Sequence, residues 1–283
     1  MPYIQPFDPW KSPLCTCPPK YSLNPYTGCG HRCLYCYATS FIKNFYKPRP
    51  KKNFLKIVER ELKKLPKNSL ISLSNSSDPY QPLESTYKYT RNFLEFLAEK
   101  NYRILIITKS DLILRDLDLL KNLRCAVSIT ITSKTLTSKL EPGAPSYERR
   151  INAIKSLYKA NIPVSVRLDP VIPGLNEKEI LEILDKVAPF VKHITASTYK
   201  AKPDSLKRLF DFFPEKRVFW EKLYLKEGKR LGNAIYLKDK IRYELINPLY
   251  KKAKEYGISF ATCREALKMF ENHQKCDGSF LIS

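Results

Sequence analysis

The chain has 283 residues, 43% of them hydrophobic, a length that suits one large domain or one domain with an appendage. No run of eighteen apolar residues occurs, which excludes a membrane-spanning helix, and residues 1–10 lack the apolar core of a secretory signal, so we expect a cytoplasmic protein. Lys and Arg number 50 against 28 Asp and Glu, and the net charge of +22 favours a polyanionic partner such as nucleic acid over the balanced lysine-rich surface typical of thermophiles.

A proline-rich, irregular arm at residues 1–20 is followed by alternating strand and helix patterns. Short apolar or β-branched runs predict strands at 21–26, 70–74, 103–108, 125–132, 162–168 and 193–197. Amphipathic stretches predict helices at 54–65, 87–100, 116–122, 147–160 and 177–190, the last with Asn176 as N-cap and Glu179 as its capping-box partner. Six such units predict an α/β fold built as a partial (β/α)6 barrel over residues 21–200, with its chemistry at the C-terminal ends of the strands.

Residues 201–283 interrupt this alternation. They contain an aromatic and basic stretch at 217–224, a long helical pattern at 238–256, a short strand at 258–261 and a short helix at 264–271. We therefore expect three parts, namely an arm (1–20), the barrel (21–200) and a mixed α/β C-terminal extension (201–283) that packs on the barrel.

The strongest signal for function is a loop that follows the first predicted strand and carries Cys29, Cys33 and Cys36. Three thiolates with this spacing can reach three irons of a [4Fe–4S] cluster and leave the fourth iron open, which is typical of a catalytic site. Gly28 and Gly30 let the backbone wrap closely around such a cluster. The alternative is a structural zinc site with His31 as fourth ligand, but that residue lies between two of the cysteines, where the geometry is poor.

This loop, with an aromatic residue before its last cysteine, resembles the motif of the radical S-adenosylmethionine (SAM) superfamily. The wider sequence resembles the spore photoproduct lyase-like branch, over roughly residues 21–200. The matching segments are NPYTGCGHRCLYCYA (24–38), SNSSDPYQPLE (74–84), ITKSDLILRDLDLL (107–120), LEPGAPSYERRINAI (140–154) and DPVIPGLNEKEI (169–180).

The resemblance implies an enzyme in which the open iron binds SAM, an electron from an external donor cleaves SAM to a 5′-deoxyadenosyl radical, and that radical abstracts a hydrogen atom from the substrate. It implies SAM contacts at Ser74, Asn75, Ser76, Ser77 and Asp78 for the methionine, at Lys109, at Ser128 and Thr130 for the ribose, at Val171, Ile172, Pro173 and Gly174 for the adenine, and at Tyr37 beside it. It assigns no catalytic residue.

Each of these contacts has a simpler alternative. The segment 74–78 reads equally as a polar turn before Pro79, Ser128 and Thr130 as small side chains filling the barrel, and Pro173-Gly174 as a turn. The sequence also departs from the branch, because spore photoproduct lyases carry a hydrogen-donor cysteine beside the polar turn and this chain has none there. Repair of spore-type thymine lesions is therefore not expected.

Four further cysteines lie near the chain ends, Cys15 and Cys17 in the arm and Cys263 and Cys276 in the extension. Together they predict a possible second site that holds an Fe–S cluster or zinc, and four unrelated thiols are the alternative. Cys125, the remaining thiol, is expected to fill the core.

The extension interleaves basic and aromatic residues, as nucleic-acid-binding surfaces do: Lys216, Arg217, Trp220, Lys222, Tyr224, Lys226, Lys229 and Arg230. The alternative is an amphipathic helix whose aromatic side chains dock on the barrel. We expect a radical SAM enzyme that modifies RNA or repairs DNA on an unstacked base. Radical modification of a peptide or small metabolite is a second hypothesis, and a non-enzymatic metal- and nucleic-acid-binding protein is a third.

Overall fold

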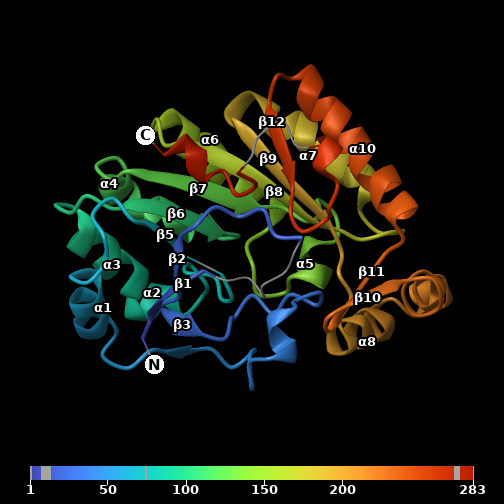
Figure 1. The fold of residues 1–283 in the computed structure, drawn as a ribbon, viewed down its shortest axis with the longest axis horizontal. Coiled ribbons are helices and arrows are strands. Elements are labelled where there is room, and N and C mark those ends of the chain that lie inside the picture. Colours follow the sequence, from blue (N-terminus) through green and yellow to red (C-terminus); the bar gives the residue numbers. More distant parts are fainter. Residues whose placement is uncertain (1, 8–13, 74, 271–274, 283) are drawn as a thin grey trace.

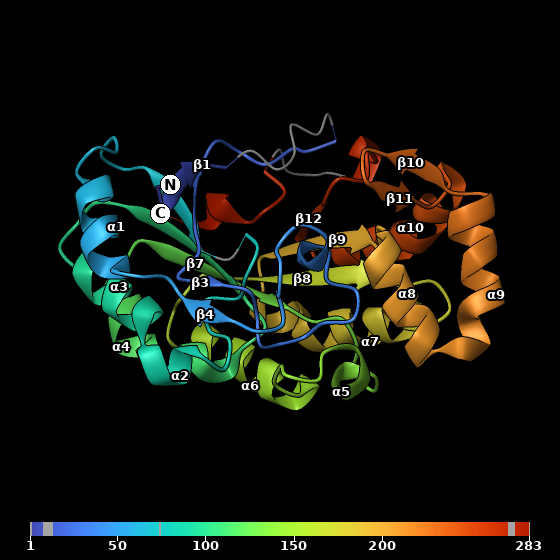
Figure 2. The same cartoon turned by 90° about the horizontal axis from the view of Figure 1, so that it is seen from below.

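The computed structural model describes residues 2–7, 14–73, 75–270 and 275–282. Its centre is a sheet of eight strands in the order β1-β2-β5-β6-β7-β8-β9-β12, with helices along its outer face (Figures 1 and 2). The strands are β1 (Ile4–Pro6), β2 (Tyr21–Leu23), β5 (Leu70–Leu73), β6 (Arg103–Thr108), β7 (Cys125–Thr130), β8 (Val164–Val171), β9 (His193–Thr198) and β12 (Ser259–Thr262). All neighbouring pairs are parallel except β1–β2.

The predicted partial barrel is confirmed, because β2 and β5 to β9 are the six strands expected from the sequence. The helices between them also match: α1 (Phe54–Leu62), α3 (Tyr89–Leu97), α4 (Leu117–Leu120), α6 (Tyr147–Lys159) and α7 (Glu177–Val187). Short helices α2 (Glu84–Tyr87) and α5 (Thr137–Leu140) and a two-stranded pair, β3 (Tyr26–Thr27) with β4 (Arg49–Pro50), lie in the connections.

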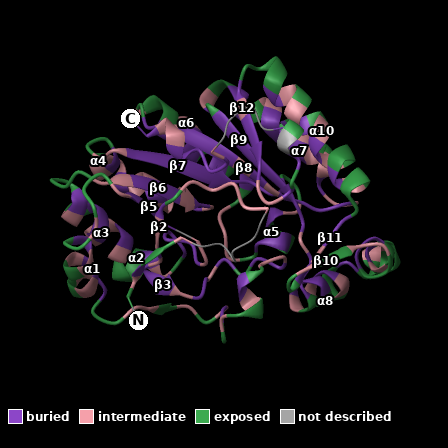
Figure 3. Cartoon of the chain, viewed as in Figure 1, coloured by how far each residue is buried: buried purple, intermediate pink, exposed green. Residues whose placement is uncertain are grey.

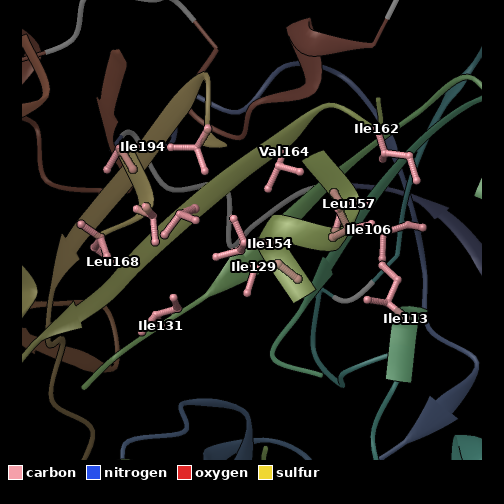
Figure 4. Packing of buried hydrophobic residues seen from close by; sticks show 14 of the residues in the cluster. Ile106, Ile113, Ile129, Ile131, Ile154, Leu157, Ile162, Val164, Leu168 and Ile194 are labelled. Atoms are coloured by element: carbon pink, nitrogen blue, oxygen red, sulfur yellow. The ribbon is translucent and has the colours of Figure 1, made fainter. Parts of the chain in front are cut away.

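The outer face of the sheet carries the main hydrophobic core. Alternate residues such as Ile106, Ile129 and Leu168 belong to this core, and Ile129 and Ile106 lie beside Ile154 and Leu157 of α6 (Figure 4). The strands are buried on both faces and the helices only on their inner sides, as Figure 3 shows. Pairing of nearly continuous apolar strands with one-sided helices is the pattern of a parallel sheet.

The inner face is mixed, with small polar side chains beside a smaller apolar cluster that includes Leu105 and Ala126. Ser128 and Ser165 lie side by side on β7 and β8, and His193 follows in register on β9. Part of this face is covered by the end of the chain, since Ile282 packs with Leu105 and Gly278 approaches Ser165 so closely that an added Cβ would lie 2.9 Å from its Oγ. The C-terminal segment therefore fills one end of the concave face, and the other end opens into a cavity.

The C-terminal region adds α8 (Pro203–Phe212), α9 (Arg217–Trp220), the hairpin β10 (Lys229–Leu231) and β11 (Ala234–Tyr236), and α10 (Asp239–Glu255). β12 from this region pairs with β9, so the region contributes a strand to the main sheet as well as packing against it. The helix predicted at 264–271 is wrong over its described part, where only a 3₁₀ turn at Lys268–Phe270 forms.

The capping box predicted for α7 is also wrong. Asn176 is the N-cap residue but makes no side-chain capping bond, because its amide accepts from Ile172 N and donates to the carbonyls of Thr132 and Pro170. Glu179 accepts hydrogen bonds from the 133–135 turn instead. No helix in the described part of the chain combines the length and apolar character that a membrane crossing requires.

Candidate functional site

A cavity of about 910 Å³ lies at the C-terminal ends of the strands and is lined by all three loop cysteines, Cys29, Cys33 and Cys36. The loop begins directly after β3, and its first two thiols are buried. The sequence thus brings the three sulfur-bearing residues to the edge of the sheet where parallel α/β folds place their chemistry.

Two hydrogen bonds made by the side chain of one glutamine fix the first half of the loop. Gln81 accepts a hydrogen bond from Gly30 N at 2.8 Å and donates one to Gly28 O at 2.9 Å, so its amide spans Cys29. Gly28 has a φ of +82°, and an added Cβ would lie 2.4 Å from Phe45 O. Only glycine fits there, and Cys29 N can then donate to the same carbonyl at 2.8 Å.

The middle of the loop lies against a second segment, residues 140–143. Leu34 N donates to Leu140 O at 2.9 Å, and Gly143 N donates to His31 O at 3.0 Å. The approach is so close that a Cβ on Gly143 would lie 2.0 Å from Gly30 O. This contact explains why a glycine follows Pro142 far from the cysteine loop in sequence.

Arg208 of α8 fixes the second half of the loop. Its guanidinium donates to Leu34 O at 2.9 Å and to Cys36 O at 3.1 Å. Tyr46 donates to Cys33 O at 2.6 Å. The loop carbonyls are therefore satisfied by the surrounding protein, and the three thiols remain available to a ligand in the cavity.

Burial raises the pKa of all three thiols: that of Cys29 to about 12, that of Cys33 well above its usual value, and that of Cys36 above its usual value. Lys109 lowers the pKa of Cys33 and Cys36 in opposition to this effect. Buried thiols of this kind form stable thiolates only when a metal supplies positive charge. The donor set fits an iron–sulfur cluster with one open iron.

His31 lies in the same cavity lining as these thiols and contacts an acidic side chain. Its Nδ1 lies 3.4 Å from Asp78 Oδ2, and both side chains are buried. Asp78 also accepts from Thr108 Oγ1 at 2.7 Å and from Lys109 N at 2.8 Å. Burial raises the pKa of Asp78, but His31 and these hydrogen bonds outweigh it and hold that pKa below its usual value. This contact occupies Nδ1 of His31, whereas Nε2 is buried without a hydrogen-bond partner among the described residues, so the pairing with Asp78 does not decide against the zinc alternative.

The polar turn after β5 is organised by Asn24. Its Oδ1 accepts from the backbone N–H groups of Asn75, Ser76 and Ser77 at 3.1–3.3 Å. Ser77 Oγ donates to Tyr26 O at 2.9 Å. Residues 75–78 all line the cavity, whereas Ser74, the first residue predicted for this contact, lies outside the described residues.

A buried ionic network lies behind the loop. Glu141 is ion-paired with Arg150, accepts from the Tyr35 hydroxyl, and lies 3.7 Å from Lys109 Nζ. Burial raises the pKa of Glu141, but Arg150 and Lys109 outweigh it and hold that pKa at about 2. The carboxylate is thus ionised and orients Lys109 at the cavity edge.

The cysteine loop also lies within the region that matches a known protein family. The sequence profile of the radical SAM superfamily matches residues 23–187, more than half of the chain and the whole cysteine loop. The chain belongs to the radical SAM superfamily. It is therefore a radical SAM enzyme, of a family that uses a [4Fe–4S] cluster and SAM.

Several relatives share this region. A protein of Methanocaldococcus jannaschii is 36% identical over 193 residues, which are 66% of this chain and 71% of that protein. A protein of Acidianus two-tailed virus is 30% identical over 177 residues, 56% of this chain and 58% of its own length. The radical SAM Nalpha-GlyT isomerase of Pseudomonas phage M6 is 26% identical over 261 residues, 85% of this chain but only 53% of the phage protein.

Solved structures share the fold. A spore photoproduct lyase mutant with bound AdoMet and dinucleoside spore photoproduct superimposes with a TM-score of 0.69 at 17% identity, covering 86% of this chain and 75% of the lyase. SuiB of Streptococcus suis bound to S-adenosylmethionine gives a TM-score of 0.54 at 14% identity, covering 85% of this chain and 49% of SuiB. At these identities the comparison concerns the fold alone.

The structure brings only some of the predicted SAM contacts of this radical SAM enzyme to the cavity. Tyr37, Asn75 to Asp78, Lys109 and Thr130 line it. Ser128 lies one pleat deeper than Thr130, at the level of Ser165, and is fully buried away from the cavity lining. Val171, Ile172, Pro173 and Gly174 are also outside the lining.

The segment 171–174 instead meets the C-terminal region. Trp220 is fully buried and donates its indole N–H to Pro173 O at 2.9 Å. Tyr224 is buried too and donates to Tyr199 O at 3.1 Å. The two most prominent aromatic side chains of the basic stretch therefore dock on the barrel, the second of the two interpretations that the sequence left open.

Sequence reasoning missed an ionic cluster at the ends of β8 and β9. Arg167 pairs with Asp169 at 2.9 Å, and Lys200 pairs with Glu265 at 2.6 Å. Burial raises the pKa of Asp169, but Arg167 and Lys200 hold it below its usual value. Arg167, Asp169 and Lys200 line the cavity across from the cysteine loop. Their strand-end position was the available signal, but the partner of Lys200 is Glu265, which follows β12 and is distant in sequence.

Proposed function

We propose that this radical SAM enzyme acts on a nucleic acid, RNA or DNA, whose target base enters the cavity unstacked. Cys29, Cys33 and Cys36 would hold the [4Fe–4S] cluster, and Tyr37, Lys109 and the turn at 75–78 would contact SAM. When bound, the cluster and SAM supply a hydrogen-abstracting radical. The protein binds and orients the substrate, and its largely buried walls exclude water.

The charge of the cavity is the observation that carries this proposal. Its described lining includes eight Lys and Arg residues and three Asp residues. The cationic side chains are Lys20, Arg32, Lys51, Lys109, Arg167, Lys200, Lys202 and Arg264. Lys20, Lys109, Arg167 and Lys200 are ion-paired with carboxylates. The positive charge that remains on this concave surface, in a chain of net charge +22, concentrates polyanions and steers them inward.

Aromatic side chains accompany these charges. Tyr35, Tyr37, Phe41 and Tyr199 line the same cavity, and Tyr37 and Phe41 are 40% and 42% exposed. Exposed rings beside cations are suited to stack an unpaired base while the cations contact its phosphates. The volume of about 910 Å³, which the cluster and SAM would share with the substrate, lies within the range of small-molecule sites, so the cavity suits a single unstacked base rather than a duplex.

The relatives support the same class of substrate. The lyase that shares the fold was solved with a dinucleoside ligand, and the phage relative is named for an isomerisation of Nalpha-GlyT. Because the chain spans about half of the phage protein, and because no cysteine occupies the donor position expected of a spore photoproduct lyase, we propose nucleic-acid modification or an unidentified lesion as the target rather than spore-type repair.

Salt-dependent binding tests the proposal. Labelled single-stranded RNA and DNA are titrated with the cluster-loaded enzyme and SAM from 50 to 200 mM salt, in which six phosphate contacts on a single strand alone weaken binding about 300-fold. The double variant Arg32→Gln/Arg264→Gln should lower the slope of log K against log salt by about 1.4. The matched control, Lys178→Gln/Lys186→Gln, changes two exposed lysines of α7 outside the cavity lining and should leave the slope near that of the wild type.

A flat response for the wild-type enzyme would exclude nucleic acid and favour a peptide or small metabolite. Anaerobic incubation with SAM and a reductant distinguishes the two enzymatic hypotheses, with nucleic acid or with a peptide or metabolite as substrate, from the non-enzymatic hypothesis. Production of 5′-deoxyadenosine is expected, and intact SAM with a fully loaded cluster would refute the proposed enzymatic activity.

A further inference from the structure

Four cysteines that are far apart in the sequence meet at one wall of the cavity. Cys15 and Cys17 come from the N-terminal arm, and Cys263 and Cys276 come from the C-terminal region. The sulfur atoms of Cys17 and Cys276 are 3.6 Å apart. Cys15 contacts Cys17 through its thiol, and Cys263 lies close enough to both Cys17 and Cys276 to interact with them electrostatically.

The backbone around these cysteines is held in place by buried interactions. Lys20 Nζ and Asp277 Oδ2 form an ion pair at 2.5 Å, with both side chains 2% exposed, and it joins the arm to the chain end. Cys276 O accepts from Thr195 Oγ1 at 2.7 Å. Cys263 directly follows β12, and its N–H donates to Ala196 O at 2.9 Å. Three of the four thiols are thus attached to the sheet or to the buried ion pair beside it.

The chemistry of this cluster is that of a metal site. All four thiols are free, and four converging thiolates select zinc or iron–sulfur clusters among the common metal centres. Two sulfurs bound to one tetrahedral zinc at about 2.3 Å are about 3.8 Å apart, close to the Cys17–Cys276 spacing. The cationic groups Lys20 and Arg167 lie beside these thiols and would offset the charge of the thiolates.

The four thiols do not yet surround one common metal position. No three His, Cys, Asp or Glu side chains within the described ranges already surround a common ion position. Binding of one ion therefore includes rotation of Cys15 or Cys263, both of which are partly exposed. An iron–sulfur cluster, whose thiolates bind different irons, requires wider spacing than one ion does.

We propose that Cys15, Cys17, Cys263 and Cys276 bind a second metal centre, zinc or an iron–sulfur cluster, that fastens the two ends of the chain together beside the substrate cavity. This centre is separate from the Cys29–Cys36 loop and does not depend on which substrate the enzyme takes. It forms part of the cavity wall, so its loss opens the arm and the wall together.

Metal analysis of a variant without the loop cysteines tests this directly. Cys29→Ala/Cys33→Ala/Cys36→Ala should retain the second centre, seen as about one zinc per chain or as about four irons with matching sulfide. Zinc identifies a closed structural ion, and iron with sulfide identifies an auxiliary cluster. Adding Cys17→Ser and Cys276→Ser should remove that remaining metal, whereas Cys125→Ser, a substitution of a buried core cysteine outside both sets, should not.

A second measurement keeps the test valid if the serine variants fail to fold. In the triple-alanine variant, Cys15, Cys17, Cys263 and Cys276 should resist alkylation until a chelator is added, and peptide mass spectrometry identifies the protected positions. A folded triple-alanine variant without metal, or one whose four thiols are alkylated equally with and without chelator, would overturn the proposal, as would a Cys17–Cys276 disulfide in the anaerobically isolated protein. None of these three results bears on radical chemistry at the cysteine loop, which is measured separately by SAM cleavage in the wild-type enzyme.

Discussion

Substitution of Gly143 by alanine should displace the cysteine loop without unfolding the protein. An added Cβ would lie 2.0 Å from Gly30 O, whereas contacts under 3.0 Å essentially never occur, so the two backbones must separate by about 1 Å. The separation weakens the Gly143–His31 hydrogen bond and shifts Cys29 and Cys33 together with the backbone between them. Overpacking of this kind costs about 1–3 kcal/mol of stability, and a displacement of about 1 Å at a reacting centre can cost about 100-fold in rate.

The assay compares iron content, SAM cleavage and urea unfolding of Gly143→Ala with those of Gly257→Ala. Gly257 has a φ of +66° and no atom within 4 Å of its added Cβ, so its alanine variant costs about 1–2 kcal/mol through backbone conformation alone. We expect both variants to be destabilised and only Gly143→Ala to lose iron and SAM cleavage. If Gly143→Ala binds iron and cleaves SAM as the wild type does, the 140–143 segment does not position the loop.

Three further predictions concern side chains around the loop and the barrel. Arg208→Lys removes the paired hydrogen bonds to Leu34 O and Cys36 O, at about 1 kcal/mol each, and should speed iron loss to a chelator about thirtyfold. Arg217→Lys, at an exposed ion pair of the same region, should not. Glu141 has a pKa of about 2 against 4.5 when exposed, so its contribution to stability is complete above pH 4.5 and is lost as the pH falls toward 2. In the Cys29/Cys33/Cys36→Ala background, the protein with Glu141 should lose about 2 kcal/mol more unfolding free energy between pH 6 and pH 3 than the Glu141→Gln variant, measured by urea unfolding. Equal losses would show that Glu141 is not the titrating group. Trp220→Phe removes the hydrogen bond to Pro173 O and should cost about 1 kcal/mol of stability while leaving nucleic-acid affinity unchanged; a tenfold weaker affinity would place this side chain in the binding surface.

Local patterns predicted most of the fold. Short apolar or β-branched runs located the six parallel strands, and amphipathic stretches located the helices between them, because each pattern reports a burial that its own segment experiences. The errors occur where tertiary contacts override local chemistry. The Asn176 side chain binds Thr132 O and Pro170 O instead of capping its helix, and the segment predicted as a helix at 264–271 places Glu265 against Thr198 and Lys200.

The candidate site likewise combines segments that are contiguous in sequence with positions that depend on tertiary structure. The cysteine loop and the turn at 75–78 are contiguous in sequence, and both line the cavity. The positions of Ser128 and of residues 171–174 depend on how deep the cavity reaches along each strand, which strand boundaries alone do not specify. For Ser128 the C-terminal segment sets this depth, because Cys276 O binds Thr195 and Gly278 covers Ser165. With that depth filled, Thr130 is left at the cavity and Ser128 beneath it. Residues 171–174 are instead covered by Trp220.

The C-terminal region also brings two of the four terminal cysteines to the cavity wall. By adding β12 beside β9, the C-terminal region carries Cys263 to a strand end, which is where a parallel sheet exposes its reactive residues. By returning through the concave face, it carries Cys276 to within 3.6 Å of Cys17. A chain end that filled only a hydrophobic gap would need neither thiol, and the buried Lys20–Asp277 pair would be a costly way to hold it. An ion pair that fixes the arm against the chain end beside four thiols is more simply explained as the support of a site that binds a ligand there.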